Sequence, residues 1–505
     1  MGNRVSQFVK SDMGVLLLLA LLRFVFHLAT NGNYGFHRDE LQTLDDARNL
    51  DWGFVAYPPL TPLLGRLELL LFGPSLVGFR IVAALAVSAA MVVTGLIAKE
   101  LGGGRHAQIL AAVASGISPV SLIQGAVLQY VSLDYLWGVT ATYFLVRLVK
   151  SQDPRWWIAI GCMLGLGMET RYTMGFLALG IVAAVLLSPE RKFLLSPWLW
   201  AGVALSLLIF LPNLIWQARH HFISLEFLNY LHARDLRQGR YKNFYLGQLL
   251  TTVNVATSLL ALLGLWFYFV RQEGKRFRLL GWLFVATFAL FALAGSRSYY
   301  TAPLYPSLLA AGSVLFGLWE TTTKPALMRI AYGLQWAAIA ALGLGFILLV
   351  TPVAPIGSGL WKVTSKVHDQ FREELGWPDL AEHVAAVYRA LPESDRQRAG
   401  ILTGNYGEGG ALNLYGPALG LPPAMTLTNS FWYRTFDPRE PQTVILVGFD
   451  LDEAQQLFES CSVAGKNTNR YGAENEESRD HPDILVCHNL HRKWPDYWAR
   501  ARRFG

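Results

Sequence analysis

Two adjacent carboxylic acids, Asp39 and Glu40, could do chemistry in this chain, and they follow a short run, Phe36-His-Arg. A carboxylate beside a hydroxyl can accept its proton while the oxygen forms a new bond, which accelerates such reactions roughly 10²–10⁴-fold. Two neighbouring carboxyl groups could share that work. The ordinary alternative is that both acids belong to a solvated loop face.

The residues around these acids follow a helical spacing. Apolar residues recur on one face and polar residues on the other, namely Leu41, Leu44 and Ala47 opposite Asp39, Gln42, Asp46 and Asn49. A short amphipathic helix of this kind is suited to the membrane–water interface. Pro58 and Pro59 break the pattern, and residues 60–72 are expected to continue as a second interfacial segment.

Further charged residues lie at the ends of apolar stretches. Asp134 is placed just inside one, where a central acid costs roughly 2.5–3.5 kcal/mol. Arg171 and Arg297 lie at predicted outer turns, and Tyr300 follows Arg297 closely. A cation beside a phenol hydroxyl can stabilise a developing negative charge. The plain alternatives are a helix cap for Asp134 and an interface anchor for Arg171.

Basic and imidazole groups follow another apolar stretch. Arg219, His220 and His221 come directly after it, and the next loop carries four more basic residues. This charge would attract an anionic carrier or acceptor, and a solvated loop is an equally good interpretation. Adjacent histidines are poorly spaced for chelating one metal from a helix, so no metal site is predicted.

Apolar stretches supply the elements that must position these groups. The chain of 505 residues is 53% hydrophobic and 16% charged, whereas soluble proteins average about 25% charged residues. Stretches of about 20 apolar residues predict roughly eleven transmembrane helices. They are expected near 12–30, 75–97, 106–124, 132–150, 155–170, 172–188, 195–213, 245–270, 278–295, 300–319 and 327–350.

The basic loops predict the orientation. Arg4 and Lys10 precede the first apolar run, and the loops on the same side carry further basic residues, which are Lys99, Arg105, Arg147, Lys150, Arg155, Arg191, Lys192, Arg271, Lys275, Arg276, Arg278, Lys324 and Arg329. The positive-inside bias makes this side cytoplasmic, and an odd number of helices then places the C-terminal segment outside. We expect a membrane domain over residues 1–352 and a soluble extracytoplasmic domain over 360–505.

The C-terminal segment is predicted to be a small α/β domain. Its patterns favour a helix at 381–391 and strands at 400–403, 443–448 and 483–487. Residues 403–410, Thr-Gly-Asn-Tyr-Gly-Glu-Gly-Gly, could open a helix, but the glycine spacing does not fit a nucleotide-binding loop. They are interpreted as a tight turn or an acceptor-binding surface. Whether Cys461 and Cys487 pair is left open.

Several motifs resemble one known family. Phe36-His-Arg-Asp-Glu-Leu, Trp52-Gly-Phe, Tyr57-Pro-Pro-Leu-Thr-Pro and Pro212-Asn-Leu-Ile-Trp resemble bacterial members of the protein O-mannosyltransferase superfamily, which includes the ArnT and Rgt transferases. The resemblance implies the GT-C fold, a mainly α polytopic membrane architecture. It also implies that Asp39 is the catalytic base, with Glu40 beside it, and that Asp134 is a second acid of the site.

The same resemblance implies how a lipid-linked donor is held. Arg297 and Tyr300 are expected near the donor phosphate, and Arg171 replaces a lysine of related sequences. Tyr57 stands where some relatives have a lysine that meets the carrier phosphate, so a phosphate contact there is in doubt. The expected carrier or acceptor contacts are Tyr57, Arg219 and His220.

The resemblance implies an inverting membrane glycosyltransferase of the bacterial inner membrane. It would move a sugar from a polyprenyl-phosphate to a hydroxyl of lipid A, lipopolysaccharide core, another glycan or a protein on the periplasmic side. This chemistry requires no cofactor, and a divalent cation near the acids stays open. Nucleic acid is not an expected partner, because the net charge of +7 is spread over short loops. Neither the sugar nor the acceptor is predicted.

Two other functions are compatible with a polytopic chain. A lipid-linked sugar transporter or flippase would carry ionisable or interrupted helices near the bilayer midplane, in paired halves. Here the acids cluster at one predicted face and the halves show no match. A non-catalytic scaffold with a sensory tail would leave the helix that carries Asp39 unexplained.

Overall fold

The computed structural model describes residues 11–322 and 325–505, so Arg4, Lys10 and Lys324 of the predicted topology lie outside it. The described chain forms two compact units. Unit 1 comprises the part up to Asn31, Tyr57–Thr61 and Arg80–Thr351, and unit 2 comprises Gly32–Ala56, Pro62–Phe79 and Pro352–Gly505. These units differ from the predicted domains, because most of the first loop belongs with the C-terminal segment.

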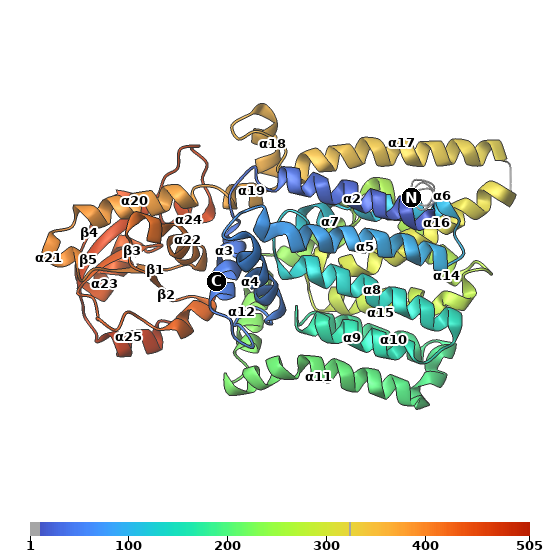
Figure 1. Ribbon diagram of the computed structural model, residues 1–505, viewed down its shortest axis with the longest axis horizontal. Helices are drawn as coiled ribbons and strands as arrows, with labels where there is room; N and C mark the ends of the chain where they lie inside the picture. The colour runs from blue at the N-terminus through green and yellow to red at the C-terminus, as the bar shows by residue number, and fades with distance from the viewer. Residues whose placement is uncertain (1–10, 323–324) are drawn as a thin grey trace. The chain divides into compact units, whose positions relative to one another are not determined.

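Unit 1 is a bundle of helices. Their bounds are α2 (Asp12–Thr30), α5 (Ile81–Glu100), α6 (Arg105–Gly116), α7 (Pro119–Gln124), α8 (Tyr130–Ser151), α9 (Trp156–Met168), α10 (Met174–Leu186), α11 (Pro197–Arg219), α12 (Ile223–Arg237), α13 (Phe244–Gly247), α14 (Val255–Phe269), α15 (Arg278–Leu293), α16 (Tyr305–Thr322) and α17 (Pro325–Val350). The helices α2, α5, α8, α9 and α11 pack successively side by side (Figure 1).

Several of these helices can cross a membrane. Among the described residues, six segments are long and apolar enough, namely Asp12–Thr30, Gly78–Glu100, Pro197–Arg219, Lys275–Leu293, Ser298–Leu318 and Arg329–Val350. Two helix pairs bent by 108° and 103° raise the number to eight if each pair crosses once. The polytopic helical architecture is confirmed, whereas the count of eleven is not. One predicted helix, 106–124, is two, because α6 ends at Gly116 and α7 begins at Pro119.

Glycines allow α9 and α11 to touch through their backbones. A Cβ at Gly161 would lie 2.1 Å from the carbonyl oxygen of Gly202, and one at Gly202 would lie 2.2 Å from that of Trp157. Small residues at such contacts are common between membrane helices, where close packing rather than water exclusion joins them. Only 11% of the most apolar stretch of α11 is buried within the protein, which is typical of a lipid-facing helix.

Unit 2 contains a five-stranded mixed sheet in the order β2-β1-β3-β5-β4. The strands are β1 (Gly400–Thr403), β2 (Ala424–Thr426), β3 (Thr443–Val447), β4 (Phe458–Lys466) and β5 (Asp483–Leu490). β1 pairs in parallel with β2 and β3, and β5 pairs antiparallel to β3 and β4. The predicted α/β character is confirmed by β1, β3 and β5. The sequence missed β2, which is short, and β4, which is mostly exposed.

Helices pack on this sheet. Their bounds are α18 (Gly359–Val367), α19 (Gln370–Glu373), α20 (Trp377–Ala390), α21 (Glu393–Arg396), α22 (Tyr406–Tyr415), α23 (Leu451–Leu457), α24 (Glu476–Asp480) and α25 (Trp494–Arg500). α20 and α25 lie on opposite sides of the sheet (Figure 1). On the α25 side, Trp494 and Trp498 pack against Val444 and Leu446. The predicted helix at 381–391 is the C-terminal part of α20.

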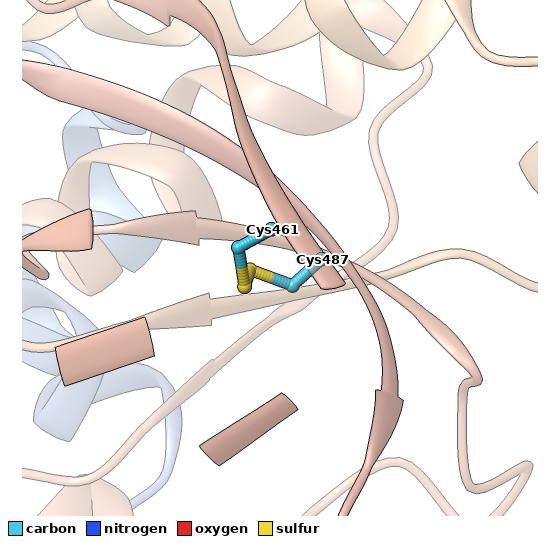
Figure 2. Close-up of a disulfide and its surroundings, with 2 residues drawn as sticks. All are labelled: Cys461 and Cys487. Carbon is cyan, nitrogen blue, oxygen red and sulfur yellow. A yellow bond between two sulfur atoms is a disulfide. The ribbon is translucent and has the colours of Figure 1, made fainter. Parts of the chain in front are cut away.

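A disulfide joins Cys461 of β4 to Cys487 of β5 (Figure 2). The two residues are direct cross-strand partners, with Cα atoms 4.1 Å apart. The register of the antiparallel pair therefore brings the sulfurs together, and that register depends on β4, which the sequence did not predict. Disulfides of this kind persist in oxidising compartments.

The first loop contributes α3 (Arg38–Arg48) and α4 (Leu60–Phe72), and α3 packs against α22 within unit 2. The predicted apolar face of α3 is fully buried, as Leu41, Leu44 and Ala47 show. Its polar face is covered in the middle, since Gln42 and Asp46 are 4% and 0% exposed, whereas Asp39 and Asn49 at its ends stay accessible. Protein therefore covers the middle of that face, more of it than expected for a helix lying in the membrane interface.

Close approach of α3 and α22 requires a glycine. A Cβ at Gly410 would lie 2.7 Å from the carbonyl oxygen of Leu41. Gly410→Ala should force the two helices apart, destabilise unit 2 by about 1–3 kcal/mol and lower the melting temperature of the purified protein. Gly359→Ala is the matched control, because a Cβ there meets nothing within 4 Å. A Gly410→Ala protein that melts like the wild type would contradict this packing.

Candidate active site

The start of α3 is set by a capping box. Glu40 Oε2 accepts a hydrogen bond of 2.9 Å from the backbone N–H of His37, and His37 Nδ1 accepts one of 3.1 Å from the N–H of Asp39. These bonds satisfy backbone donors that a helix N-terminus otherwise leaves unpaired. Glu40 is fully buried. Glu40 therefore caps the helix. Because its side chain is buried and bonded to the backbone, it is not placed to share the role of base with Asp39.

Asp39 lies at the first turn of α3 with its side chain 43% exposed. The phenol of Tyr406, the first residue of α22, donates a hydrogen bond of 2.8 Å to Asp39 Oδ1. Burial and the nearby charge of Asp39 raise the pKa of Tyr406 well above its usual value, so the phenol keeps its proton. A donor to a carboxylate stabilises its ionised form. Asp39 is thus an accessible carboxylate with one oxygen held in place.

Arg38 anchors the same turn to the C-terminal segment. Its Nη1 lies 2.6 Å from Glu476 Oε2 and 3.3 Å from Glu477 Oε1, and 3.9 Å from Glu373 Oε2. Its guanidinium group also lies 5.6 Å from the centre of the Tyr406 ring. Burial raises the pKa of Glu477 well above its usual value, although the charge of Arg38 opposes this shift. This partly buried network holds the backbone that carries Asp39.

The remaining polar side chains of α3 are held by the segment that follows β2. Arg434 forms ion pairs with both Asp45 and Asp46. Asn429 donates a hydrogen bond of 3.1 Å to Gln42 Oε1. These contacts leave Asp39 as the accessible acid of the helix, since Asp45 and Asp46 are at most 4% exposed.

A second cluster forms around Arg171 in unit 1, in the turn between α9 and α10. Its guanidinium carbon lies 4.1 Å from the ring centre of Tyr300, 5.0 Å from that of Tyr130 and 5.5 Å from that of Tyr299. Its side chain is 8% exposed. Aromatic faces stabilise a cation that has lost most of its water. The turn thus holds a buried positive charge among phenol rings.

Asp134 is the charged partner in this cluster. Its Oδ2 lies 3.5 Å from Arg171 Nη1, at the limit of a hydrogen bond, and its side chain is 6% exposed. Within the described residues, Arg171 Nη1 has no hydrogen-bond partner. A small cavity adjoins Asp134 and is also lined by Thr173, Thr287 and Tyr300. The structure therefore brings together three predicted site residues, Asp134, Arg171 and Tyr300.

Tyr57 lies next to this cluster, whereas Arg297 is paired with an acid of another helix. The Tyr57 ring centre lies 5.8 Å from that of Tyr130, which stacks on Arg171. Arg297 instead forms a two-point ion pair with Asp235 of α12, with distances of 2.6 and 2.8 Å. The donors that the sequence assigned to a phosphate are therefore directed at a carboxylate of the protein.

His220 and Arg219 lie at the end of α11. The His220 ring stacks on Trp216 at 3.9 Å, and its Nδ1 lies 2.8 Å from the Trp216 carbonyl oxygen. Arg219 is exposed. Their predicted role in holding a carrier or acceptor stays a prediction. Among residues 11–322 and 325–505, no group of three or more His, Cys, Asp or Glu side chains is arranged to hold a metal ion.

Most partners of the predicted residues could not be inferred from local sequence patterns. Tyr406 lies in the glycine-rich stretch that was interpreted as a turn or acceptor surface, and that stretch does open a helix, α22. No local pattern links it to Asp39, which is 367 positions away. Asp235 belongs to none of the motifs described above. As an acid among the basic residues of its loop, it could have been recognised as a partner for an arginine.

The comparisons with known proteins agree with this fold. The family model described as dolichyl-phosphate-mannose-protein mannosyltransferase matches residues 56–216, which include Tyr57, Asp134 and Arg171. ArnT from Cupriavidus metallidurans, solved with undecaprenyl phosphate and in the apo state, superimposes with a TM-score of 0.55 at 13% identity. Each of these matches covers 94% of this chain and 97% of ArnT.

A further structure, the arabinofuranosyltransferase AftD from mycobacteria, gives a TM-score of 0.49 at 16% identity, over 94% of this chain and 42% of AftD. No curated protein sequence matches. The match to ArnT extends over nearly the whole chain, so it includes the helices of unit 1 and the sheet of unit 2. The chain therefore shares its fold with ArnT, and residues 56–216 match the mannosyltransferase family model.

Proposed function

We propose that this chain is a membrane glycosyltransferase that moves a sugar from a polyprenyl-phosphate carrier to a hydroxyl acceptor, with inversion at the anomeric carbon. The observation that carries the proposal is Asp39, an accessible carboxylate on a helix whose other acids are buried and paired. The fold shared with ArnT, which has been solved with undecaprenyl phosphate, supports the choice of donor.

Asp39 acts as the base in the proposed reaction. The acceptor oxygen attacks the anomeric carbon and forms the new glycosidic bond, while its proton passes to Asp39. The bond between the anomeric carbon and the phosphate oxygen breaks on the opposite face, and the electron pair leaves with the polyprenyl phosphate. A base that is accessible to the hydroxyl and ionised beforehand fits this step.

Arg171 binds the departing phosphate in the proposed reaction. The guanidinium group is nearly buried, and among the described residues its Nη1 makes only a long ion pair of 3.5 Å with Asp134 and no hydrogen bond. Such a donor is suited to a phosphate oxygen, because charge-assisted hydrogen bonds are strong where water is excluded. Tyr300 and Tyr130 hold the cation in place through their rings. We assign Arg297 no direct phosphate contact, since Asp235 binds it at two points.

We place unit 2 on the extracytoplasmic side of the membrane. The Cys461–Cys487 disulfide supports this location, because disulfides are rare where thiols are kept reduced. The loop charges that predict a cytoplasmic N-terminus support it independently. A lipid-linked donor also suits a site outside the cytoplasm, since the carrier itself delivers the sugar. The reaction written above requires no cofactor.

Replacing the base tests the proposal directly. Asp39→Asn should lower transfer by about 10²–10⁴-fold, because the amide cannot take the acceptor proton. The assay is transfer of labelled sugar from a synthetic polyprenyl-phosphate donor in membranes or detergent. Asp51→Asn is the control, since Asp51 is an exposed acid of the same loop. Wild-type transfer by the Asp39→Asn protein would remove Asp39 from the mechanism.

The phosphate role of Arg171 predicts a different kinetic pattern. Arg171→Lys keeps the charge that Asp134 needs but loses the forked donor geometry. We expect kcat/KM for the donor to fall about tenfold or more, with the wild-type melting temperature nearly kept. Arg191→Lys, which changes an exposed arginine, should have no effect. Unchanged donor kinetics in Arg171→Lys would show that this cation does not bind the phosphate.

A further inference from the structure

We propose that the C-terminal segment supplies a positioning residue for the reaction, Tyr406, whose phenol holds the Asp39 carboxylate in its reactive orientation. This inference rests on the proposed function and extends it, because it makes unit 2 part of the catalytic machinery. The observation behind it is the hydrogen bond of 2.8 Å from the Tyr406 hydroxyl to Asp39 Oδ1, which lies wholly within unit 2.

Tyr406 is itself held rigidly. It is the first residue of α22, directly after the cap Asn405, whose side chain accepts a hydrogen bond from Gly407 N while Glu408 bonds back to Asn405 N. Tyr406 is 6% exposed, and a Cβ on Gly505 would lie 2.8 Å from its ring. The phenol therefore has little freedom to turn away from Asp39.

An accessible carboxylate needs such a restraint to act as a base. A side chain exposed to water samples several rotamers, and catalysis is sensitive to misplacement of about 1 Å. A fixed donor to one oxygen limits the rotation and leaves the carboxylate on the accessible side of α3. The same donor favours the ionised carboxylate over the protonated one.

Other charged groups face this pair. His37 Nδ1, from the residue that caps α3, lies 3.8 Å from Asp39 Oδ2. Arg38 lies beside the Tyr406 ring and is bound by acids of the segments packed against it, which are Glu373, Glu476 and Glu477. These groups are the same in the wild type and in a variant that lacks only the phenol hydroxyl, so comparing the two isolates the effect of that hydroxyl.

The test is the pH dependence of transfer by Tyr406→Phe, which keeps the ring and removes the hydroxyl. Without the donor, the Asp39 carboxyl should hold its proton to higher pH, so the acid limb of kcat/KM should move upward by about one pH unit. Transfer at neutral pH should fall severalfold, with KM for the donor unchanged. Tyr388→Phe is the matched control, because Tyr388 donates a similar bond, 2.9 Å, to the Arg396 carbonyl oxygen in the same unit.

A second variant separates positioning from folding. Replacing Tyr406 with 3-fluorotyrosine keeps the shape and strengthens the phenol as a donor, so the acid limb should move to lower pH. A Tyr406→Phe protein with the wild-type pH profile would overturn the inference, and so would equal shifts in Tyr388→Phe. The proposed function would survive either result as long as Asp39→Asn stays inactive; an active Asp39→Asn protein would overturn both.

Discussion

A polar group buried without a partner costs about 1–3 kcal/mol, and α3 buries several. They are paired with residues of the C-terminal segment, Arg38 with Glu476 and Glu477, Gln42 with Asn429, and Asp45 and Asp46 with Arg434. These pairings determine the rotation of α3 about its axis. That rotation leaves Asp39 accessible, and the bond from Tyr406 fixes its carboxylate. Polar contacts with the C-terminal segment thus fix the orientation of α3, in addition to the burial of its apolar face.

The cluster in unit 1 follows the same physical rule with the opposite charge. Arg171 is almost removed from water, and three phenol rings and Asp134 compensate for the loss of hydration. At Nη1 the ion pair with Asp134 is long, 3.5 Å, and no hydrogen bond is made within the described chain, so an anion at closer range would gain most there. Arg297, by contrast, is neutralised by Asp235. The two arginines thus differ in their surroundings, although the sequence had favoured Arg297, with Tyr300, over Arg171 as the phosphate ligand.

Local signals predicted the parts of this protein that depend on local physics. The apolar spacing of Leu41 and Leu44 predicted α3, and the buried runs after residues 400, 443 and 483 predicted three strands, because burial leaves a pattern in the sequence itself. The strand β4 left no such pattern, so the disulfide it carries stayed open. The partners of Asp39 and Arg297 come from distant segments, and no periodicity connects position 39 with 406. The capping role of Glu40 was readable in principle, since an acid three residues after a polar cap is a known signal.

If the Tyr406 hydroxyl holds the Asp39 carboxylate in its reactive orientation, the two groups work as one unit. A double-mutant cycle on transfer rates measures that coupling most directly, by comparing Asp39→Asn, Tyr406→Phe and the double variant with the wild type. We expect strong non-additivity: removing the hydroxyl slows the wild type but has no further effect once the base is absent. Effects that multiply independently would contradict it, because the two groups would then act without reference to each other.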